Sequence, residues 1–520
     1  MPSKAPKTSR HLEVERKFDV DESTVTPSFE GIAAVARVQK TPVESLDATY
    51  FDTPKQDLAH NKITLRRRTG GHDAGWHLKL PAGPDARTEV HAPLDASAED
   101  SVPNELLDVV LAIVRDRPVV PVARITTKRE SQVLYSALDT ALAEFSNDHV
   151  IAWAADSADS SGGPDSEPQQ QEWREWELEL VETNGSPDTE LLSRLGNRLL
   201  DAGAAPAGHG SKLARVLGAA VQSNGTPPTP RDPLHRAVAE QVDELLVWDR
   251  AVRADAYDAV HQMRVTTRKI RSLLRDSHDS FGLSDGDWVL DELRELAGVL
   301  GVARDAEVLA ERYQHHLDQL APELVRGPVS ERLVTGARRR YETGLRRSLI
   351  AMRSQRYFRL LDALDSIVAH VPDAQSDEEA TPVTIDAAYK KVRKAAKAAD
   401  SLGQRDRPDR DIPEDDHRHD EALHLIRKRS KRLRYTAAAT GEDEVSKQAK
   451  AIQTLLGDHH DSVVSRQHLL EQAEAALSAG EDTFTYGLLY QQETELAASC
   501  SDQLDGALRK LDKSVRTARD

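Results

Sequence analysis

Alternating charged residues between His11 and Val20 indicate a strand with one charged face. Side chains in a strand point to opposite faces with a period of two, so Glu13, Glu15 and Lys17 point the same way. The apolar residues Leu12, Val14 and Phe18 point the other way. If this strand belongs to a closed barrel, the charged face lines the interior, and a charged interior requires a charged ligand.

The same inverted pattern recurs in three later segments. With the strand of Glu13 included, glutamates occupy the first and last of the four strands, and cations occupy the two middle ones. Clustered carboxylates suit a hard divalent ion such as Mg²⁺ or Mn²⁺, and several Arg and Lys residues suit the oxygens of a phosphate chain. A two-sided surface sheet is the alternative, but its uncovered apolar face would aggregate. The residues that share a face are Arg66 and Arg68; His77 and Lys79; and Glu175, Glu177 and Glu179.

The elements that carry these residues fall into two parts. Up to about residue 220, strand-like runs alternate with turns, whereas the later half has the period of helices throughout. A stretch rich in Ser, Gly, Asp and Gln at 154–171 reads as a flexible insertion, and the proline-rich stretch 223–233 reads as a linker. Strands are expected at 48–51, 63–68, 76–80, 124–129 and 173–181, and helices at 104–114 and 189–202.

The helical half contains an internal repeat. The sequence HQMRVTTRKIR, which begins at His261, matches HLIRKRSKRLR, which begins at His424. Downstream of each copy a Leu-Gly pair recurs, at 300–301 and at 456–457. Two elements in the same order imply a duplicated helical unit that packs as a pseudo-symmetric pair and brings its two basic helices together.

Each copy of the repeat carries a basic stripe, because its cations follow helical spacings of three and four. The stripes contain no acidic residue and, among aromatic residues, only Tyr435, so a phosphate polymer without bases is a better ligand than single-stranded nucleic acid. Duplex nucleic acid and an acidic protein stay open as alternatives. The first stripe is His261, Arg264, Arg268, Lys269, Arg271 and Arg275, and the second is His424, Arg427, Lys428, Lys431, Arg432 and Arg434.

Length and composition agree with this organisation. A chain of 520 residues is too long for one hydrophobic core, so two or three domains are expected. The net charge of −18 disfavours nonspecific nucleic-acid binding. Cys500 is the only cysteine, which excludes an intramolecular disulfide. With no apolar run long enough to span a bilayer, we expect a cytoplasmic location and no membrane partner.

The charged strands resemble the CYTH domain, the triphosphate tunnel metalloenzyme fold, whose Glu-x-Glu-x-Lys hallmark corresponds to Glu13, Glu15 and Lys17. The strands of Arg66, Arg68 and Lys79 match as well. The helical half is similar to the CHAD domain, a helical module that binds inorganic polyphosphate. Further residues that match the CYTH pattern are Arg87, Thr88, Glu89, Arg129, Asp148, Glu177, Glu179 and Lys212.

The two resemblances imply an α+β multidomain protein. Its N-terminal part is then a closed eight-stranded antiparallel β-barrel with helices, which forms a triphosphate tunnel. Its C-terminal part is an all-α helical bundle with an internal duplication. The expected boundaries are 8–220 for the tunnel domain, 221–232 for the linker and 233–515 for the helical domain, with repeats at about 233–370 and 383–515.

The implied function is metal-dependent hydrolysis of inorganic triphosphate, coupled to polyphosphate binding by the helical domain and to association with polyphosphate granules. Water then attacks the terminal phosphorus, with Mg²⁺ or Mn²⁺ as cofactor. The residues expected to serve the phosphate chain are Lys17, Arg66, Arg68, Lys79, Arg129 and Lys212. The residues expected to hold metal are Glu13, Glu15, Asp148, Glu177 and Glu179.

Several alternatives stay open at this point. Strand parity places Arg124 and Lys128 on the face opposite to Arg129, and Asp139 competes with Asp148. The tunnel charges identify only a triphosphate, so a thiamine or nucleoside triphosphatase, or an adenylate cyclase-like enzyme, is also compatible. A non-enzymatic polyphosphate-binding scaffold is the second class. The oligomeric state cannot be read from the sequence.

Overall fold

The computed structural model describes residues 9–83, 85–94, 101–154, 170–181, 187–218, 233–276, 281, 283, 287–369, 385–403 and 413–519. Residues 155–169 of the predicted insertion and 223–232 of the predicted linker lie outside this set. The chain divides into two compact units, one comprising residues 1–300 and 347–371 and the other residues 301–346 and 372–520. The domain boundaries expected from the sequence stay a prediction.

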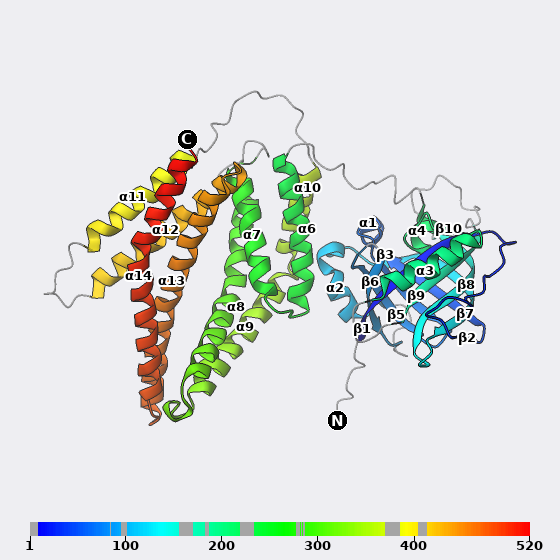
Figure 1. Ribbon diagram of the computed structural model, residues 1–520, viewed down its shortest axis with the longest axis horizontal. Coiled ribbons are helices and arrows are strands. Elements are labelled where there is room, and N and C mark those ends of the chain that lie inside the picture. The colour runs from blue at the N-terminus through cyan, green and yellow to red at the C-terminus, as the bar shows by residue number, and fades with distance from the viewer. Residues whose placement is uncertain are drawn as a thin grey trace. The chain divides into compact units, whose positions relative to one another are not determined.

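A closed β-barrel forms the N-terminal part, as predicted (Figure 1). Eight antiparallel strands follow one another in the order β1-β6-β5-β4-β3-β7-β8-β9, and β9 pairs back with β1. The short strands β2 and β10 add to β7 and β1. The strands are β1 (Ser9–Val20), β2 (Arg37–Lys40), β3 (Glu44–Asp52), β4 (Thr64–Thr69), β5 (Gly75–Pro81), β6 (Ala86–Ala92), β7 (Val120–Tyr135), β8 (Ala141–Ala154), β9 (Gln170–Leu180) and β10 (Ala205–Pro206).

The apolar faces of these strands point outward and are covered by helices, so the hydrophobic core surrounds the barrel. Helix α2 (Asn104–Val114) covers β4 and β5 with Leu106 and Val110. Helix α3 (Thr189–Asp201) covers β1 and β9, and α4 (Lys212–Leu217) covers β7 and β8. A short helix, α1 (Asp57–His60), adds Leu58. With its apolar side chains used outside, the barrel keeps its charged side chains inside.

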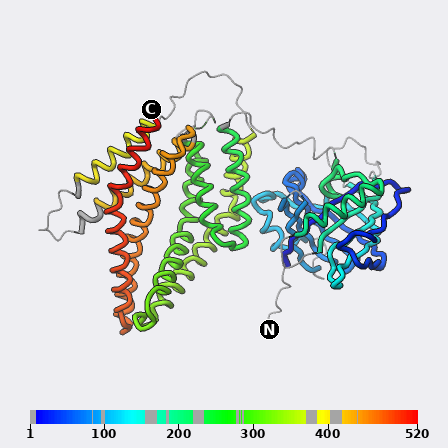
Figure 2. Tube along the Cα trace, viewed as in Figure 1, coloured from blue at the N-terminus to red at the C-terminus, as the bar shows by residue number. Residues whose placement is uncertain are grey.

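The later half of the chain is helical, as predicted. Helices α11 to α14 share one hydrophobic core, and the long helices α13 and α14 run side by side (Figure 2). None of the helices that the structure describes is long and apolar enough to cross a bilayer. The helices are α6 (Pro233–Arg253), α7 (Ala259–Asp276), α8 (Trp288–Gln319), α9 (Gly336–Ala351), α10 (Gln355–Ala369), α11 (Ile385–Gly403), α12 (Pro413–Ala439), α13 (Asp443–Ser478) and α14 (Phe484–Thr517).

The sequence repeat corresponds to two pairs of successive helices, α7 with α8 and α12 with α13. In the first pair, Arg264 Nε donates a hydrogen bond to the carbonyl oxygen of Ala297, at 3.2 Å. In the second pair, Arg427 lies against Gly457, where an added Cβ would come within 3.4 Å of Nη2. The basic helix α12 therefore contacts the second Leu-Gly pair through Arg427.

Candidate functional site in the barrel

The barrel encloses a cavity of about 480 Å³. Its wall is built from the inward positions of the strands, which alternate along each strand with the outward apolar ones. The predicted site residues that line it are Glu13, Glu15, Lys17, Arg66, Arg68, Lys79, Arg129, Glu177, Glu179 and Lys212.

Arg129 points into the cavity and is held by Asp148, which is fully buried behind it. The two residues face each other across β7 and β8, with Arg129 Nε 2.8 Å from Asp148 Oδ1. Of the competing residues, Arg124 pairs with Asp47 on the exposed face of the barrel, and Asp139 is exposed. The geometry therefore favours Arg129 and Asp148.

Lys212 lies in the middle of three carboxylates. It is the first residue of α4, where the hydroxyl of Ser211 caps the helix. Its Nζ lies 2.9 Å from Asp148, 2.6 Å from Glu175 and 2.7 Å from Glu177. Burial alone would lower the pKa of Lys212, but these carboxylates raise it well above its usual value. An ammonium group thus occupies the centre of a carboxylate cluster that has the spacing of a metal site.

Lys17 is paired in the same way with two carboxylates. Its Nζ lies 2.7 Å from Glu15 Oε2 and also bonds to Glu177. Burial would raise the pKa of Glu15, but Lys17 and Lys79 lower it to about 2. Glu15 and Lys17 are therefore charged at neutral pH and hold each other in place.

Glu13 and Glu179 are less well neutralised. Lys79 Nζ lies 2.5 Å from Glu13 Oε2, yet burial raises the pKa of Glu13 to about 7. Burial and the neighbouring Glu13 raise the pKa of Glu179 to about 8. Among the residues that the structure describes, none makes a hydrogen bond or ion pair with the Glu179 carboxylate. Further positive charge at this point would stabilise both carboxylates, so the residues fit a divalent cation.

Arg66 and Arg68 present donors that the described protein atoms do not satisfy. The Nε atoms of both are buried and have no hydrogen-bond partner among the described residues. Arg66 Nη1 donates to the hydroxyl of Tyr50 at 3.3 Å, and Arg68 pairs with Asp73. Burial and the guanidinium groups of Arg66 and Arg129 lower the pKa of Arg68 to about 9, which leaves it charged at neutral pH. Buried cationic donors without acceptors favour an anionic ligand.

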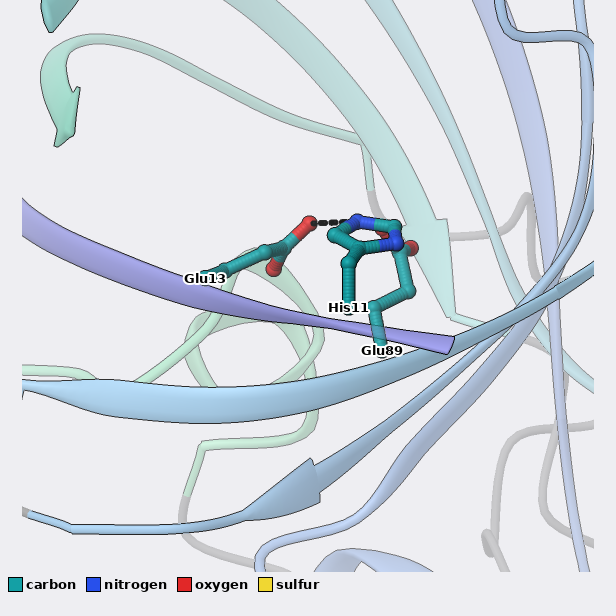
Figure 3. Close-up of side chains that lie close together, drawn as sticks. All are labelled: His11, Glu13 and Glu89. Atoms are coloured by element: carbon teal, nitrogen blue, oxygen red, sulfur yellow. Dashed lines mark ion pairs between the residues drawn. The ribbon is translucent and has the colours of Figure 1, made fainter. Parts of the chain in front are cut away.

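The structure adds residues to which the sequence assigned no role with phosphate or metal, although two of them, Arg87 and Glu89, match the CYTH pattern. His11 and Glu89 lie beside Glu13, as Figure 3 shows. His77, which shares a face with Lys79, bonds to Glu89 Oε1 through Nδ1 at 2.7 Å. Burial lowers the pKa of His77 to about 3. Further residues of the cavity wall are Tyr50, Arg87, His91 and Glu144.

The two basic stripes of the helical half lie on α7 and α12, which belong to different units. Within the first stripe, Arg264 and Arg271 donate to the α8 carbonyl oxygens of Ala297 and Leu290. Within the second, Arg434 donates to the side chain of Gln453. The exposed residues are Arg268, Lys269 and Arg275 in α7 and Lys428 in α12; the half-buried ones are His261, Arg264, Arg271, His424, Arg427, Lys431, Arg432 and Arg434.

Comparison with known families assigns both parts of the chain. Residues 11–180 match the CYTH domain, and residues 236–470 match the CHAD domain. Among solved structures, a CHAD domain from the plant Ricinus communis is 21% identical, with a TM-score of 0.37, and covers 53% of this chain and 90% of its own. A putative adenylyl cyclase from Hippeastrum, described as having a dominant triphosphatase activity, is 16% identical, with a TM-score of 0.24, over 42% of this chain and 97% of its own.

Two full-length relatives are much closer in sequence. The uncharacterized proteins MT2285 and Rv2226, from two strains of Mycobacterium tuberculosis, are each 72% identical over 523 residues and cover all of this chain and all of their own length. The chain therefore belongs to the family of these mycobacterial proteins and joins a CYTH domain to a CHAD domain.

Proposed function

We propose that the barrel hydrolyses inorganic triphosphate with a divalent metal and that the helical half binds inorganic polyphosphate. The observation that carries the first part is the pair of buried, unsatisfied Nε donors of Arg66 and Arg68 in the cavity of the barrel. A triphosphate offers several anionic oxygens in a row, and this chemistry matches a tunnel with cations on several walls.

The chain's own residues then divide into three roles. Arg66, Arg68 and Lys79 bind phosphate oxygens, and Lys17, Arg129 and Lys212 are held in position for the same purpose by buried carboxylates, including Asp148 and Glu177. Of the five residues expected from the sequence to hold the metal, we keep Glu13, Glu15 and Glu179 in this role. Asp148 and Glu177 are paired with Arg129 and Lys212 instead. When bound there, Mg²⁺ or Mn²⁺ supplies charge neutralisation and orients the attacking water. Because the donors are fixed before substrate enters, little reorganisation accompanies the reaction.

Polyphosphate binding by the helical half rests on the two basic stripes. In α7 the exposed cations Arg268 and Lys269 accompany half-buried arginines that donate to backbone carbonyl oxygens of α8. In α12 the exposed Lys428 accompanies Arg434, which donates to the side chain of Gln453. A polymer bound there raises the concentration of chain ends near the barrel. A cytoplasmic location at polyphosphate granules is part of the same proposal.

The first test measures phosphate release from tripolyphosphate with Mg²⁺ or Mn²⁺. We expect metal-dependent release by the native protein and its loss in the double variant Glu13→Gln/Glu15→Gln. If the protein is folded and binds polyphosphate but releases no phosphate, we would conclude that it is a polyphosphate-binding scaffold and not an enzyme.

The second test separates the helical half from the barrel. Replacing Arg268, Lys269 and Lys428 with serine is expected to weaken long-chain polyphosphate binding ~10-fold while tripolyphosphate cleavage stays within about twofold. The matched control replaces three exposed arginines of α9, Arg338, Arg346 and Arg347, and so removes the same charge elsewhere. Equal weakening by both variants would mean that only net charge matters.

An organic triphosphate is a second candidate substrate, because a second cavity adjoins the tunnel. Its volume is about 810 Å³, and it shares Glu15, Lys17 and Arg87 with the tunnel wall. Apolar side chains such as Phe18 and Ile63 line the rest and could contact a base or a thiamine ring. Parallel assays with ATP and thiamine triphosphate decide between the candidates, since only an organic substrate gains from this cavity.

A further inference from the structure

Three potential metal ligands converge at one place in the tunnel wall, on β1 and β6 (Figure 3). His11 Nε2 lies 3.0 Å from Glu89 Oε2 and 3.6 Å from Glu13 Oε1. All three atoms lie within 4.8 Å of one another. Glu13 and Glu89 are buried, with 5% and 4% of their surfaces exposed, whereas the His11 side chain is 36% exposed. The cluster is therefore reachable but mostly shielded from water.

The strand register fixes this convergence. His11 and Glu89 are direct partners in the antiparallel ladder of β1 and β6, and Glu13 follows His11 by two residues on the same face. Directly opposed residues in such a ladder place their side chains next to each other. The three ligands thus stand on paired strands, which hold them more rigidly than a loop would.

Each carboxylate has one oxygen anchored by a supporting side chain and one oxygen facing His11. Glu89 Oε1 is 2.7 Å from His77 Nδ1, which donates to it in the tautomer that carries the ring proton on Nδ1. Glu13 Oε2 is 2.5 Å from Lys79 Nζ. Outer partners that orient ligating carboxylates in this way are a regular feature of metal sites.

The other cluster with metal-site spacing differs, because a protein cation already contacts all of its carboxylates. In the group of Asp148, Glu175 and Glu177, the Lys212 ammonium lies within 2.9 Å of all three carboxylates. A metal ion there would have to displace a buried cation. In the His11 cluster, Lys79 contacts Glu13 through Oε2, whereas the oxygen of Glu13 that is nearest to His11 is Oε1.

We propose that His11, Glu13 and Glu89 form a divalent-cation site with one nitrogen and two oxygen ligands, which takes Mn²⁺, Co²⁺ or Zn²⁺ in preference to Mg²⁺. Imidazole is a good ligand for the transition metals, whereas Mg²⁺ prefers oxygen ligands alone. Three protein ligands leave open positions for water or a phosphate oxygen. Metal binding at this site does not require that the barrel cleaves triphosphate, because the proposal rests only on the three ligands.

The test is pulsed electron paramagnetic resonance of Mn²⁺ added in one equivalent to the full-length, metal-free protein. A ligating imidazole couples its ¹⁴N nucleus to the Mn²⁺ electron spin, and oxygen ligands give no such coupling. We expect ¹⁴N coupling in the native protein and its loss in His11→Gln. We also expect calorimetric titration to show that His11→Gln lowers Mn²⁺ affinity at least ~10-fold and changes Mg²⁺ affinity much less.

His91→Gln is the matched control, because His91 lines the same cavity outside the ligand group. It is expected to keep both the ¹⁴N coupling and the Mn²⁺ affinity. Absence of ¹⁴N coupling in the native protein overturns the proposal without reference to any variant, and so does unchanged coupling in His11→Gln. In either case His11 forms only an ion pair with Glu89. Loss of tripolyphosphate cleavage, by contrast, has no bearing on these readouts.

Discussion

Arg129 and Asp148 form a two-pronged ion pair inside the barrel, with Nε 2.8 Å from Oδ1 and Nη2 2.6 Å from Oδ2. The same strand, β7, carries Arg124, which pairs with Asp47 in the same two-pronged way on the outside. Asp148 is fully buried, whereas the Asp47 side chain is 38% exposed. The two pairs share their chemistry and differ in burial, so they allow a direct comparison of what burial does to an ion pair.

Asp148→Asn is expected to lower the free energy of unfolding by about 3–5 kcal/mol, because the buried guanidinium of Arg129 and ammonium of Lys212 lose a common counter-ion. Urea unfolding followed by tryptophan fluorescence measures the change. Asp47→Asn, which breaks the exposed pair, is the control and should cost less than about 1 kcal/mol. Similar losses in the two variants would mean that the inner pair is no more important to the fold than the outer one.

Arg66→Gln is expected to weaken tripolyphosphate binding by roughly 10- to 100-fold, because one or two charge-assisted hydrogen bonds to phosphate are lost. Its neighbour Arg67 points out of the barrel on the same strand, so Arg67→Gln should change affinity less than about twofold. Calorimetric titration without divalent metal measures binding apart from cleavage. An equal effect of both variants would argue that tripolyphosphate binds outside the tunnel.

Stability of the helical half is expected to fall as the pH is lowered from about 6.5 to 4. Burial and the guanidinium of Arg340 lower the pKa of His468 to about 4, from an ordinary value of 6.5. As the pH falls, His468 is therefore protonated in the unfolded chain before it is protonated in the folded protein. This favours the unfolded state, so the free energy of unfolding is highest above pH 6.5 and decreases as the pH falls toward 4. The full loss is roughly 3 kcal/mol. Urea unfolding followed by circular dichroism measures it.

His468→Gln provides the comparison for this pH dependence. Glutamine does not titrate in this range and keeps a side chain able to bond to Tyr313, which lies 2.8 Å from His468 Nδ1. The variant should lose less stability between pH 6.5 and 4 than the native protein does. If the free energy of unfolding changed with pH equally in the two proteins, groups other than His468 would cause the pH dependence.

Gly344→Ala is expected to destabilise the protein by about 1–3 kcal/mol, although alanine is the better helix former by about 1 kcal/mol. A Cβ at Gly344 would lie 2.7 Å from the backbone nitrogen of Ala303 and 2.8 Å from its Cα, so α9 and α8 would have to separate. At Gly487 in α14 no atom lies within 4 Å of an added Cβ, and Gly487→Ala should stabilise. Thermal unfolding followed by circular dichroism compares the two variants. If Gly344→Ala also stabilised the protein, α8 and α9 would not approach as closely as the structure indicates.

The inward face of the barrel could be predicted because the two-residue period of a strand is a local property. Glu13, Glu15 and Lys17 all line the cavity, as their spacing requires. The choice between Arg124 and Arg129 was different, because β7 carries cations on both faces and the sequence alone does not say which face is inside. Pairing with Asp148 in β8 decides it, and that pairing depends on strand register.

The contact between His11 and Glu89 also depends on strand register, which the sequence alone does not give. Each continues the alternating pattern of its own strand, since His11 precedes Glu13 by two residues and Glu89 follows Arg87 by two. The sequence did not indicate that His11 and Glu89 would be partners, because the register of β1 against β6 joins positions 78 residues apart (89 − 11). The functional roles predicted for the tunnel residues stay predictions.

The basic stripes raise a similar point for helices. Spacing alone made Arg264 and Arg268 equivalent, as members of one cationic face. In the structure Arg264 is half-buried and donates to a carbonyl oxygen of α8, whereas Arg268 is exposed. Arg264 and Arg268 differ in burial because α8 packs against only one of them, and the spacing of residues within α7 does not predict where α8 packs.

Closure of the barrel by β1 and β9 has a consequence for synthesis of the chain. Glu15 pairs with Glu179 and Lys17 with Glu177, so β1 finds this neighbour only after some 160 further residues have been made. At 5–20 residues per second a ribosome needs on the order of ten seconds or more for that stretch. Until then the nascent chain carries an open strand edge that can pair with another chain, and release of a fragment that ends before β9 leaves that edge exposed for good.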